Sequence, residues 1–83
     1  MDISRNPEQY ELTNHAYNKA KQRDIPFELV SNVIQNGDIS DAEGDNCKLF
    51  VNESHLDILP VGVVANVDTK EIITIEWQGR RVD

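Results

Sequence analysis

A long apolar stretch near the C-terminal end of the chain, from Leu56 to Val67, limits the folds that this chain can adopt. Its odd-numbered positions are all apolar: Leu59, Val61, Val63, Ala65 and Val67. Because successive side chains of a strand point to opposite faces, this alternation predicts one buried face of a β-sheet. Pro60 and Gly62 within the stretch indicate a bulge or a sheet edge.

Turn residues and shorter apolar runs predict the other strands. A hairpin loop at 68–70 leads into a return strand at 71–77, whose inward side chains we expect to be Ile73, Ile75 and Trp77. A strand at 47–51 precedes a polar turn at 52–54. A short extended piece is expected at Tyr10 to Leu12. The C-terminal half therefore predicts a three-stranded antiparallel meander.

Two short helices are predicted before these strands. Thr13 can cap a helix over 14–23, whose buried side is a thin line of Ala16 and Ala20. Asp24-Ile25-Pro26 ends this helix, since the residue before a proline is biased away from helical geometry.

The second helix carries apolar residues at helical spacing: Phe27, Val30, Val33 and Ile34. Gly37 is expected to end this helix in a left-handed conformation. The polar, acidic composition of residues 38–46 predicts a loop. Helices grouped before strands favour an α+β fold, with a two-helix hairpin packed on an antiparallel sheet.

The length of 83 residues fits one domain. We expect a loose N-terminal end at 1–9, the domain at 10–77 and a polar tail at 78–83. The N-terminal end lacks the apolar core of a signal peptide, and no run approaches the roughly 20 apolar residues of a membrane span. A cytoplasmic protein without membrane contact is therefore expected. The lone Cys47 excludes an internal disulfide and reads as a packing residue.

The chain is acidic, with 15 Asp and Glu against 8 Lys and Arg and a net charge of −7. This charge repels a polyanion at long range, so a nucleic-acid site would need a local basic patch. Acidity also serves solubility, in a salty cytoplasm among other settings, and by itself it indicates no function.

His15, Lys19 and Arg23 form the main candidate site. Their spacing of four places them along one stripe of the first helix, beside its alanine line. The positive end of the helix disfavours a protonated imidazole, which suits His15 as a general base. Lys19 and Arg23 could hold a phosphate. Such a set could cleave RNA without a metal. The alternative is that His15 caps or packs and the two cations are solvated or paired.

Two further groupings of polar residues are weaker candidates for a site. His55 and Asp57 could pair across one face of a strand, most simply as a surface pair. Trp77, Arg80 and Arg81 could stack a base and hold a backbone, although Trp77 also completes the inward face and the arginines then form a polar tail. No zinc-type spacing, phosphate-binding glycine loop or nucleophile elbow is present, so we expect no metal and no cofactor.

The order of several short motifs resembles the family called Domain of Unknown Function 4258. The matching residues are Leu12-Thr13-Asn14-His15-Ala16, Lys19, Arg23, Asp24-Ile25, Val30, Ile34 and Asn36-Gly37-Asp38, with the endings at 63–68 and 72–75. The resemblance covers roughly residues 10 to 77 and implies distant kinship with small ribonuclease toxins of the RelE and BrnT kind.

That kinship implies a small RelE-like scaffold in which His15, Lys19, Arg23 and Thr74 lie on the RNA-cleaving side. The chain departs from the family pattern at Lys19, where arginine is usual, and at Asp24, where glycine is common. Glu76 stands where an aromatic residue is frequent, one place before Trp77. The acidic charge also differs from that of ribosome-directed toxins.

Three functions remain open from the sequence. The first is a metal-independent endoribonuclease, with RNA as its substrate and Trp77 or Thr74 shaping the pocket. The second is a non-catalytic module that binds a protein partner, such as a cognate antitoxin, or a second copy of itself. The third is an acidic mimic of nucleic acid, based on the loop from Asp38 to Asp45.

Overall fold

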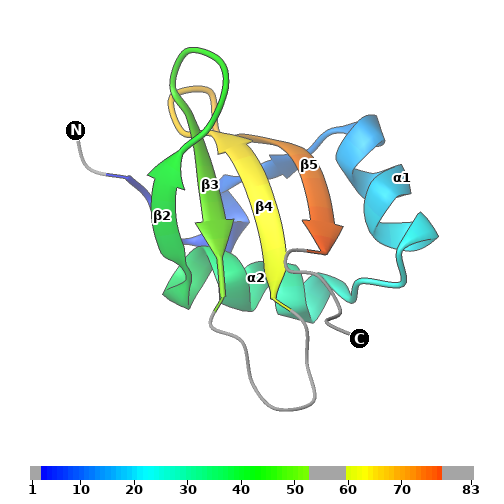
Figure 1. Cartoon of the computed structure of the whole chain (residues 1–83). Helices are drawn as coiled ribbons and strands as arrows, with labels where there is room; N and C mark the ends of the chain where they lie inside the picture. The colour runs from blue at the N-terminus through cyan, green and yellow to red at the C-terminus, as the bar shows by residue number, and fades with distance from the viewer. Residues whose placement is uncertain (1–2, 53–59, 78–83) are drawn as a thin grey trace.

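The computed structural model describes residues 3–52 and 60–77 and has an α+β fold, as the sequence predicts. The elements in chain order are η1 (Pro7–Gln9), β1 (Glu11–Leu12), α1 (Asn14–Gln22), α2 (Phe27–Asn36), β2 (Asp38–Asp41), β3 (Cys47–Val51), β4 (Val61–Asn66) and β5 (Glu71–Trp77). Both predicted helices are confirmed, with ends within one residue of those expected. They do not form the predicted two-helix hairpin, because α1 packs along β5 whereas α2 packs across β3 and β4 (Figure 1).

The strands form one mixed sheet in the order β1-β5-β4-β3-β2 (Figure 1). The predicted meander is confirmed by β3, β4 and β5, which pair antiparallel in sequence order. Two further strands extend it: β2 pairs antiparallel with β3, and β1, the predicted short N-terminal strand, pairs parallel with β5. The sheet is larger than predicted because of β2, and it is not purely antiparallel because of β1.

Strand β2 corrects the prediction of a loop from 38 to 46. Its four residues lie opposite β3, and Ile39 pairs with the fully buried Phe50. Ile39 is the one apolar residue of β2, because Asp38, Ser40 and Asp41 are polar. The segment therefore has no alternating pattern of apolar and polar residues. Pairing with β3, rather than local propensity, makes it a strand.

Helix α2 covers one face of the sheet and encloses the core with it (Figure 1). Its inward residues Val30, Val33 and Ile34 are buried, as predicted, and so are the inward residues of β4. The central buried side chains are Phe50, Ile34, Ile75, Val33, Val61 and Val63. The other face of the sheet carries half-buried residues of β3 and β4, among them Leu49 and Val64.

A bulge in β5 corrects the predicted inward set Ile73, Ile75 and Trp77. Val64 pairs with Thr74 but Ala65 pairs with Ile72, which leaves one extra residue in β5. Ile72 is therefore buried at 3% exposure while Ile73 is 36% exposed. A bulge shifts the side-chain alternation by one residue, and strict period-two reading of a sequence misses it.

Gly37 ends α2 for a different reason from the one predicted. Its φ of −73° is not left-handed. A Cβ at this position would lie 2.5 Å from the Val33 carbonyl oxygen and 3.0 Å from that of Val51. Glycine is required because the chain turns from α2 into β2 with backbone packed directly against it.

Helix α1 lies beside β5 at the edge of the sheet (Figure 1), and its Ala16 and Ala20 belong to the same buried core as the inward residues of α2. The Thr13 hydroxyl accepts from the Ala16 N–H at 3.2 Å, which confirms the predicted cap. The same hydroxyl donates to the Ile72 carbonyl at 2.8 Å, so the cap also fixes the helix to β5. Ala16 and Ala20 are fully buried and let α1 approach the strand closely.

Candidate functional site

Helix α1 has two exposed flanks on either side of its buried alanine line. Successive helical residues are about 100° apart. His15, Lys19 and Arg23 therefore follow one side of the line through Ala16 and Ala20, and we call them the basic flank. Tyr17 and Lys21 follow the other side and are called, with Phe27, the aromatic flank.

The basic flank borders the face of the sheet that α2 leaves uncovered. Arg23 forms an ion pair with Glu76, with 4.0 Å between Nη2 and Oε1. Glu76 lies opposite Gly62 in the register, one position away from the inward Ile75. Because neighbouring strand residues point to opposite faces, Glu76 faces away from α2. Thr74, two positions earlier, shares that face.

The parallel course of α1 and β5 places Lys19 level with Thr74. Thr13 bonds to Ile72 at one end, and Arg23 meets Glu76 and Trp77 at the other. A helix rises about 1.5 Å per residue and a strand about 3.3 Å. Lys19, about 9 Å along the helix from Thr13, therefore lies beside the stretch from Thr74 to Ile75. His15 is exposed in the first turn, and Lys19 and Thr74 are half-buried.

The Arg23 guanidinium retains donor capacity. Its ion pair with Glu76 is long, and the two side chains are 31% and 49% exposed. Its Nη1 is buried and has no hydrogen-bond partner among the described residues. A buried donor without a partner costs about 1–3 kcal/mol. An acceptor that entered this site, such as a phosphate oxygen, would remove that cost.

Trp77 holds the C-terminal end of α1. Its indole Nε1 donates a hydrogen bond of 2.8 Å to the backbone oxygen of Arg23. The side chain shares the inward face with Ile75 but is 36% exposed, so the core interpretation holds only in part. Arg80 and Arg81, predicted with it, lie outside the described residues, as do His55 and Asp57.

The aromatic flank is a feature that the sequence did not indicate. The rings of Tyr17 and Phe27 stack with centroids 5.5 Å apart at 13°, and both side chains are about two-fifths exposed. The Lys21 ammonium lies 5.2 Å from the centre of the Tyr17 ring. Phe27 has helical spacing with the buried residues of α2, and only the path of α1 shows that its partner is Tyr17.

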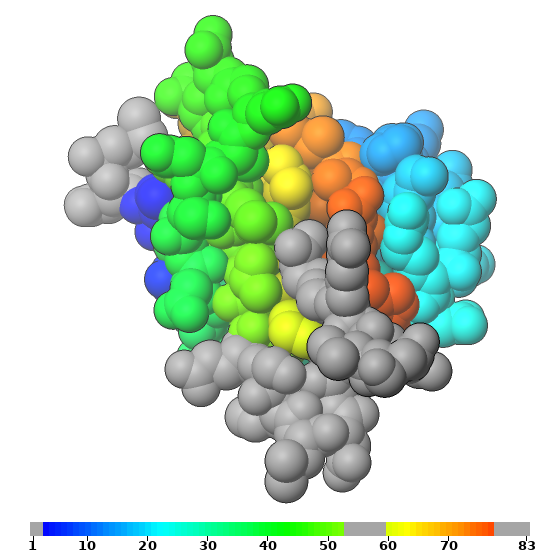
Figure 2. Space-filling view, in the orientation of Figure 1, coloured from blue at the N-terminus to red at the C-terminus, as the bar shows by residue number. Residues whose placement is uncertain are grey.

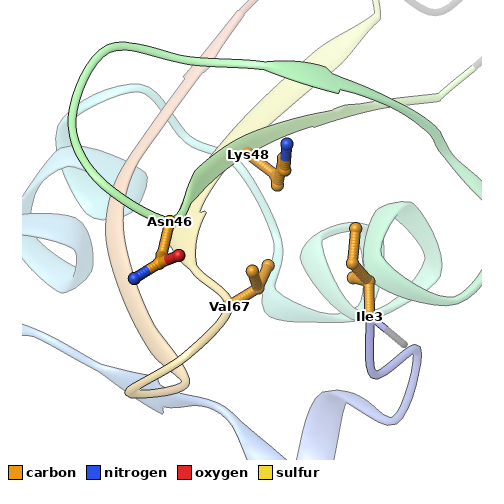
Figure 3. Close-up of a pocket in the computed structure, with 4 residues that line it drawn as sticks. All are labelled: Ile3, Asn46, Lys48 and Val67. Carbon is orange, nitrogen blue, oxygen red and sulfur yellow. The ribbon is translucent and has the colours of Figure 1, made fainter. Parts of the chain in front are cut away.

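A pocket of about 290 Å³ lies at the end of the sheet where β3 begins and β4 ends. Ile3, Asn46, Lys48 and Val67 line it (Figure 3). The Asn46 backbone has a φ of 60°, and its carbonyl accepts from the Val67 N–H at 2.8 Å. The predicted site residues are not among these lining residues, so the pocket is separate from the basic flank.

The described part of the chain contains no group of three His, Cys, Asp or Glu side chains placed to hold a metal ion. Within the same residues, neither helix has the length and apolar character needed to span a bilayer.

The model of one protein family matches residues 12–77, and its description reads domain of unknown function, DUF4258. The chain belongs to this family. Comparison with curated proteins and with solved structures gave no match.

The DUF4258 match begins at Leu12 of β1 and ends at Trp77 of β5. It therefore includes both flanks of α1 and the whole of the strand that α1 accompanies. The match confirms the family resemblance seen in the sequence. The kinship with RelE and BrnT toxins stays a prediction.

Proposed function

We propose that this DUF4258 domain is a metal-independent endoribonuclease whose site is the edge between α1 and β5. The observation that carries the proposal is the placement of the basic flank. His15, Lys19 and Arg23 run along the same uncovered side of the sheet as Thr74 and Glu76, and none of the three is fully buried.

Each side chain has a chemical role that its position permits. The His15 imidazole accepts the proton of a ribose 2′-hydroxyl, whose oxygen then attacks the adjacent phosphorus. The 5′-oxygen leaves and takes a proton from water, giving a 2′,3′-cyclic phosphate and a free 5′-hydroxyl. Lys19 and Arg23 stabilise the negative charge that develops on the phosphate oxygens. Thr74 lies level with Lys19, and its hydroxyl can form a hydrogen bond with the RNA backbone.

The local charge supports phosphate binding despite the net charge of −7. Two cations, Lys19 and Arg23, lie on the flank, and Glu76 is the carboxylate that pairs with Arg23. Screening limits long-range repulsion to about 8–10 Å at physiological ionic strength. A short single-stranded segment can therefore reach this edge, whereas association should be slower than for a basic nuclease.

A cleavage assay tests the proposal. The wild-type chain, with a chelator present, should cut a fluorogenic single-stranded RNA and leave the 2′-deoxy version intact. His15→Ala should reduce the rate about 10²–10⁴-fold, as expected for the loss of a general base. Lys21→Ala removes a lysine from the opposite flank of the same helix and should leave the rate within about twofold, while Lys19→Ala should lower it at least tenfold.

The proposal fails if the chelated protein leaves RNA intact, or if His15→Ala cuts at the wild-type rate. Equal losses for Lys19→Ala and Lys21→Ala would show that total charge, and not the basic flank, sets the rate. Circular dichroism and urea denaturation of each variant separate loss of the site from loss of the fold.

A second candidate function is a non-catalytic, partner-binding module, and the aromatic flank favours it. Aromatic residues are enriched at protein interfaces, and tyrosine is among the residues that dominate the binding energy there. If this function applies, Tyr17→Ala with Phe27→Ala should abolish recovery of a partner, and His15→Ala should not.

A further inference from the structure

Strand β2 is the edge of the sheet opposite to α1 (Figure 2). In an antiparallel pair, only alternate residues of an edge strand bond to the neighbouring strand. The hydrogen bond of 3.2 Å from the Ala42 N–H to the Cys47 carbonyl fixes which residues these are. Residues two and four positions before Ala42 also face β3.

The backbone groups of Ile39 and Asp41 therefore point away from the sheet. Their register partners are Phe50 and Lys48, but these are the pairs that exchange no backbone hydrogen bonds. Among the described residues, no other hydrogen bond uses these two N–H and two C=O groups. The edge thus presents a donor and an acceptor at each of two positions, spaced to receive another strand.

One acceptor of this edge already binds a cationic side chain. Gly37 directly precedes β2 and shares the alternation of Ile39 and Asp41. Its carbonyl accepts a hydrogen bond of 2.6 Å from Arg5 Nη1, which lies 3.4 Å from the Gln35 carbonyl as well. A guanidinium group can therefore bind to the backbone at the start of this edge.

The side chains of the edge are acidic on both faces of the sheet. Asp38 and Asp41 belong to β2, and Glu43 and Asp45 follow it in the connection to β3. Lys48 pairs with Asp41, whose side chain is nevertheless 90% exposed. A second copy of this edge would bring carboxylates opposite one another, which is destabilising. A strand with lysines or arginines would bring opposite charges together.

We propose that β2 is a docking edge for an extended, lysine- or arginine-rich segment of another protein, which adds to the sheet as an outer strand. Backbone hydrogen bonds to Ile39 and Asp41 hold the segment, and the acidic side chains select its charge. This surface lies across the sheet from the basic flank. The inference therefore stands independently of the proposed nuclease activity.

Amide hydrogen exchange, measured by NMR with a designed peptide, tests the edge directly. The probe is a ten-residue peptide that alternates lysine with threonine, and its counterpart alternates glutamate with threonine. In the free protein the Ile39 and Asp41 amides should exchange faster than those of Asp38 and Ser40. The lysine peptide should slow their exchange at least tenfold, less so at higher salt, and the glutamate peptide should leave it unchanged.

Three variants separate the backbone from the charge. Asp41→Pro removes one outward N–H without removing a hydrogen bond to β3, which edge strands tolerate, and should weaken the lysine peptide at least tenfold. Asp41→Asn keeps that N–H and should weaken binding of the lysine peptide less than Asp41→Pro does. Asp38→Lys should weaken it at least fivefold, whereas Glu28→Lys makes the same charge change on α2 and should change the affinity less than twofold.

Equal binding of both peptides would overturn the inference, as would unchanged exchange at Ile39 and Asp41. Equal effects of Asp38→Lys and Glu28→Lys would show that net charge alone accounts for the binding, and this result would also overturn the inference. Concentration-dependent dimerisation that protects the same amides without peptide would assign the edge to a second copy instead. RNA cleavage by Asp41→Pro and peptide binding by His15→Ala are measured in parallel, so the two proposals succeed or fail separately.

Discussion

Arg23 is the residue where the packing of α1 and the proposed chemistry meet. Its carbonyl oxygen accepts from Trp77, which fixes the end of the helix. Its guanidinium reaches Glu76 on the neighbouring strand, while Nη1 stays unpaired among the described residues. The sequence placed Arg23 on the correct stripe because a spacing of four defines one side of a helix. It gave no sign of the carboxylate that opposes it, since Glu76 is 53 positions away along the chain.

Replacing Glu76 should increase the affinity for RNA. Glu76→Gln removes the carboxylate that competes with phosphate for Arg23, and the dissociation constant should fall about two- to fivefold. Stability should change by at most about 1 kcal/mol, because exposed ion pairs contribute little. Glu71→Gln makes the same charge change on the same strand and serves as the control. Equal gains in the two variants, measured by fluorescence anisotropy, would contradict a specific role for the pair.

Asp41 shows a second charge effect at the residue scale. A hydrogen bond from Lys48, with the attraction of its ammonium, holds the pKa of the Asp41 carboxyl below its ordinary value. A carboxyl whose pKa is lower in the folded state stabilises the fold above its unfolded pKa. That contribution disappears as the pH falls through the folded pKa.

Lys48→Met should therefore raise the Asp41 pKa toward its ordinary value, as followed by carbonyl chemical shifts during an NMR titration. The small stability difference between variant and wild type should vanish in acid. Lys21 lies on α1, at the opposite edge of the sheet from Asp41, so Lys21→Met should leave the Asp41 titration unchanged. An unaltered Asp41 pKa in Lys48→Met would show that the contact does not form in solution.

At the scale of elements, the sequence predicted those whose pattern is local. Thr13 followed by the alanine line gave α1, and the helical spacing of Val30, Val33 and Ile34 gave α2. Strand β2 was missed because it holds a single apolar residue, Ile39. It becomes a strand by pairing with β3, where Ile39 lies opposite Phe50. The bulge at Ile73 was missed because it exists only in the register with β4. Both are properties of strand pairs, and no window of the sequence contains them.

The cap of α1 joins the helix to β5 and should be worth more than an isolated cap. Thr13→Val removes the acceptor for the Ala16 N–H and the donor to the Ile72 carbonyl. We expect a loss of about 2 kcal/mol in the free energy of unfolding, at the upper end for a helix cap. Thr13→Ser keeps the hydroxyl and should lose well under half of that. Equal losses of the two variants in urea denaturation would contradict the prediction, because they would show that the methyl group contributes as much to this junction as the hydroxyl.

At the scale of the whole molecule, the sheet separates two chemically different edges. The basic flank accompanies β5 at one side, and the acidic β2 closes the other (Figure 2). The net charge of −7 does not reveal this division, because composition carries no information on where the charges lie. The predicted site residues His15, Lys19, Arg23 and Thr74 do lie along one edge. Their spatial relation depends on the parallel pairing of β1 with β5, which the sequence did not show.

RNA binding at the α1–β5 edge can be followed by NMR amide shifts during titration with a short RNA. The reactive 2′-hydroxyls of this RNA are replaced by 2′-fluoro groups, so that it cannot be cut. The amides of His15, Lys19, Arg23 and Thr74 should shift in a saturable manner, and those of Ile39 and Asp41 should not. Uniformly small shifts, or saturable shifts confined to residues away from α1 and β5, would contradict RNA binding at this edge.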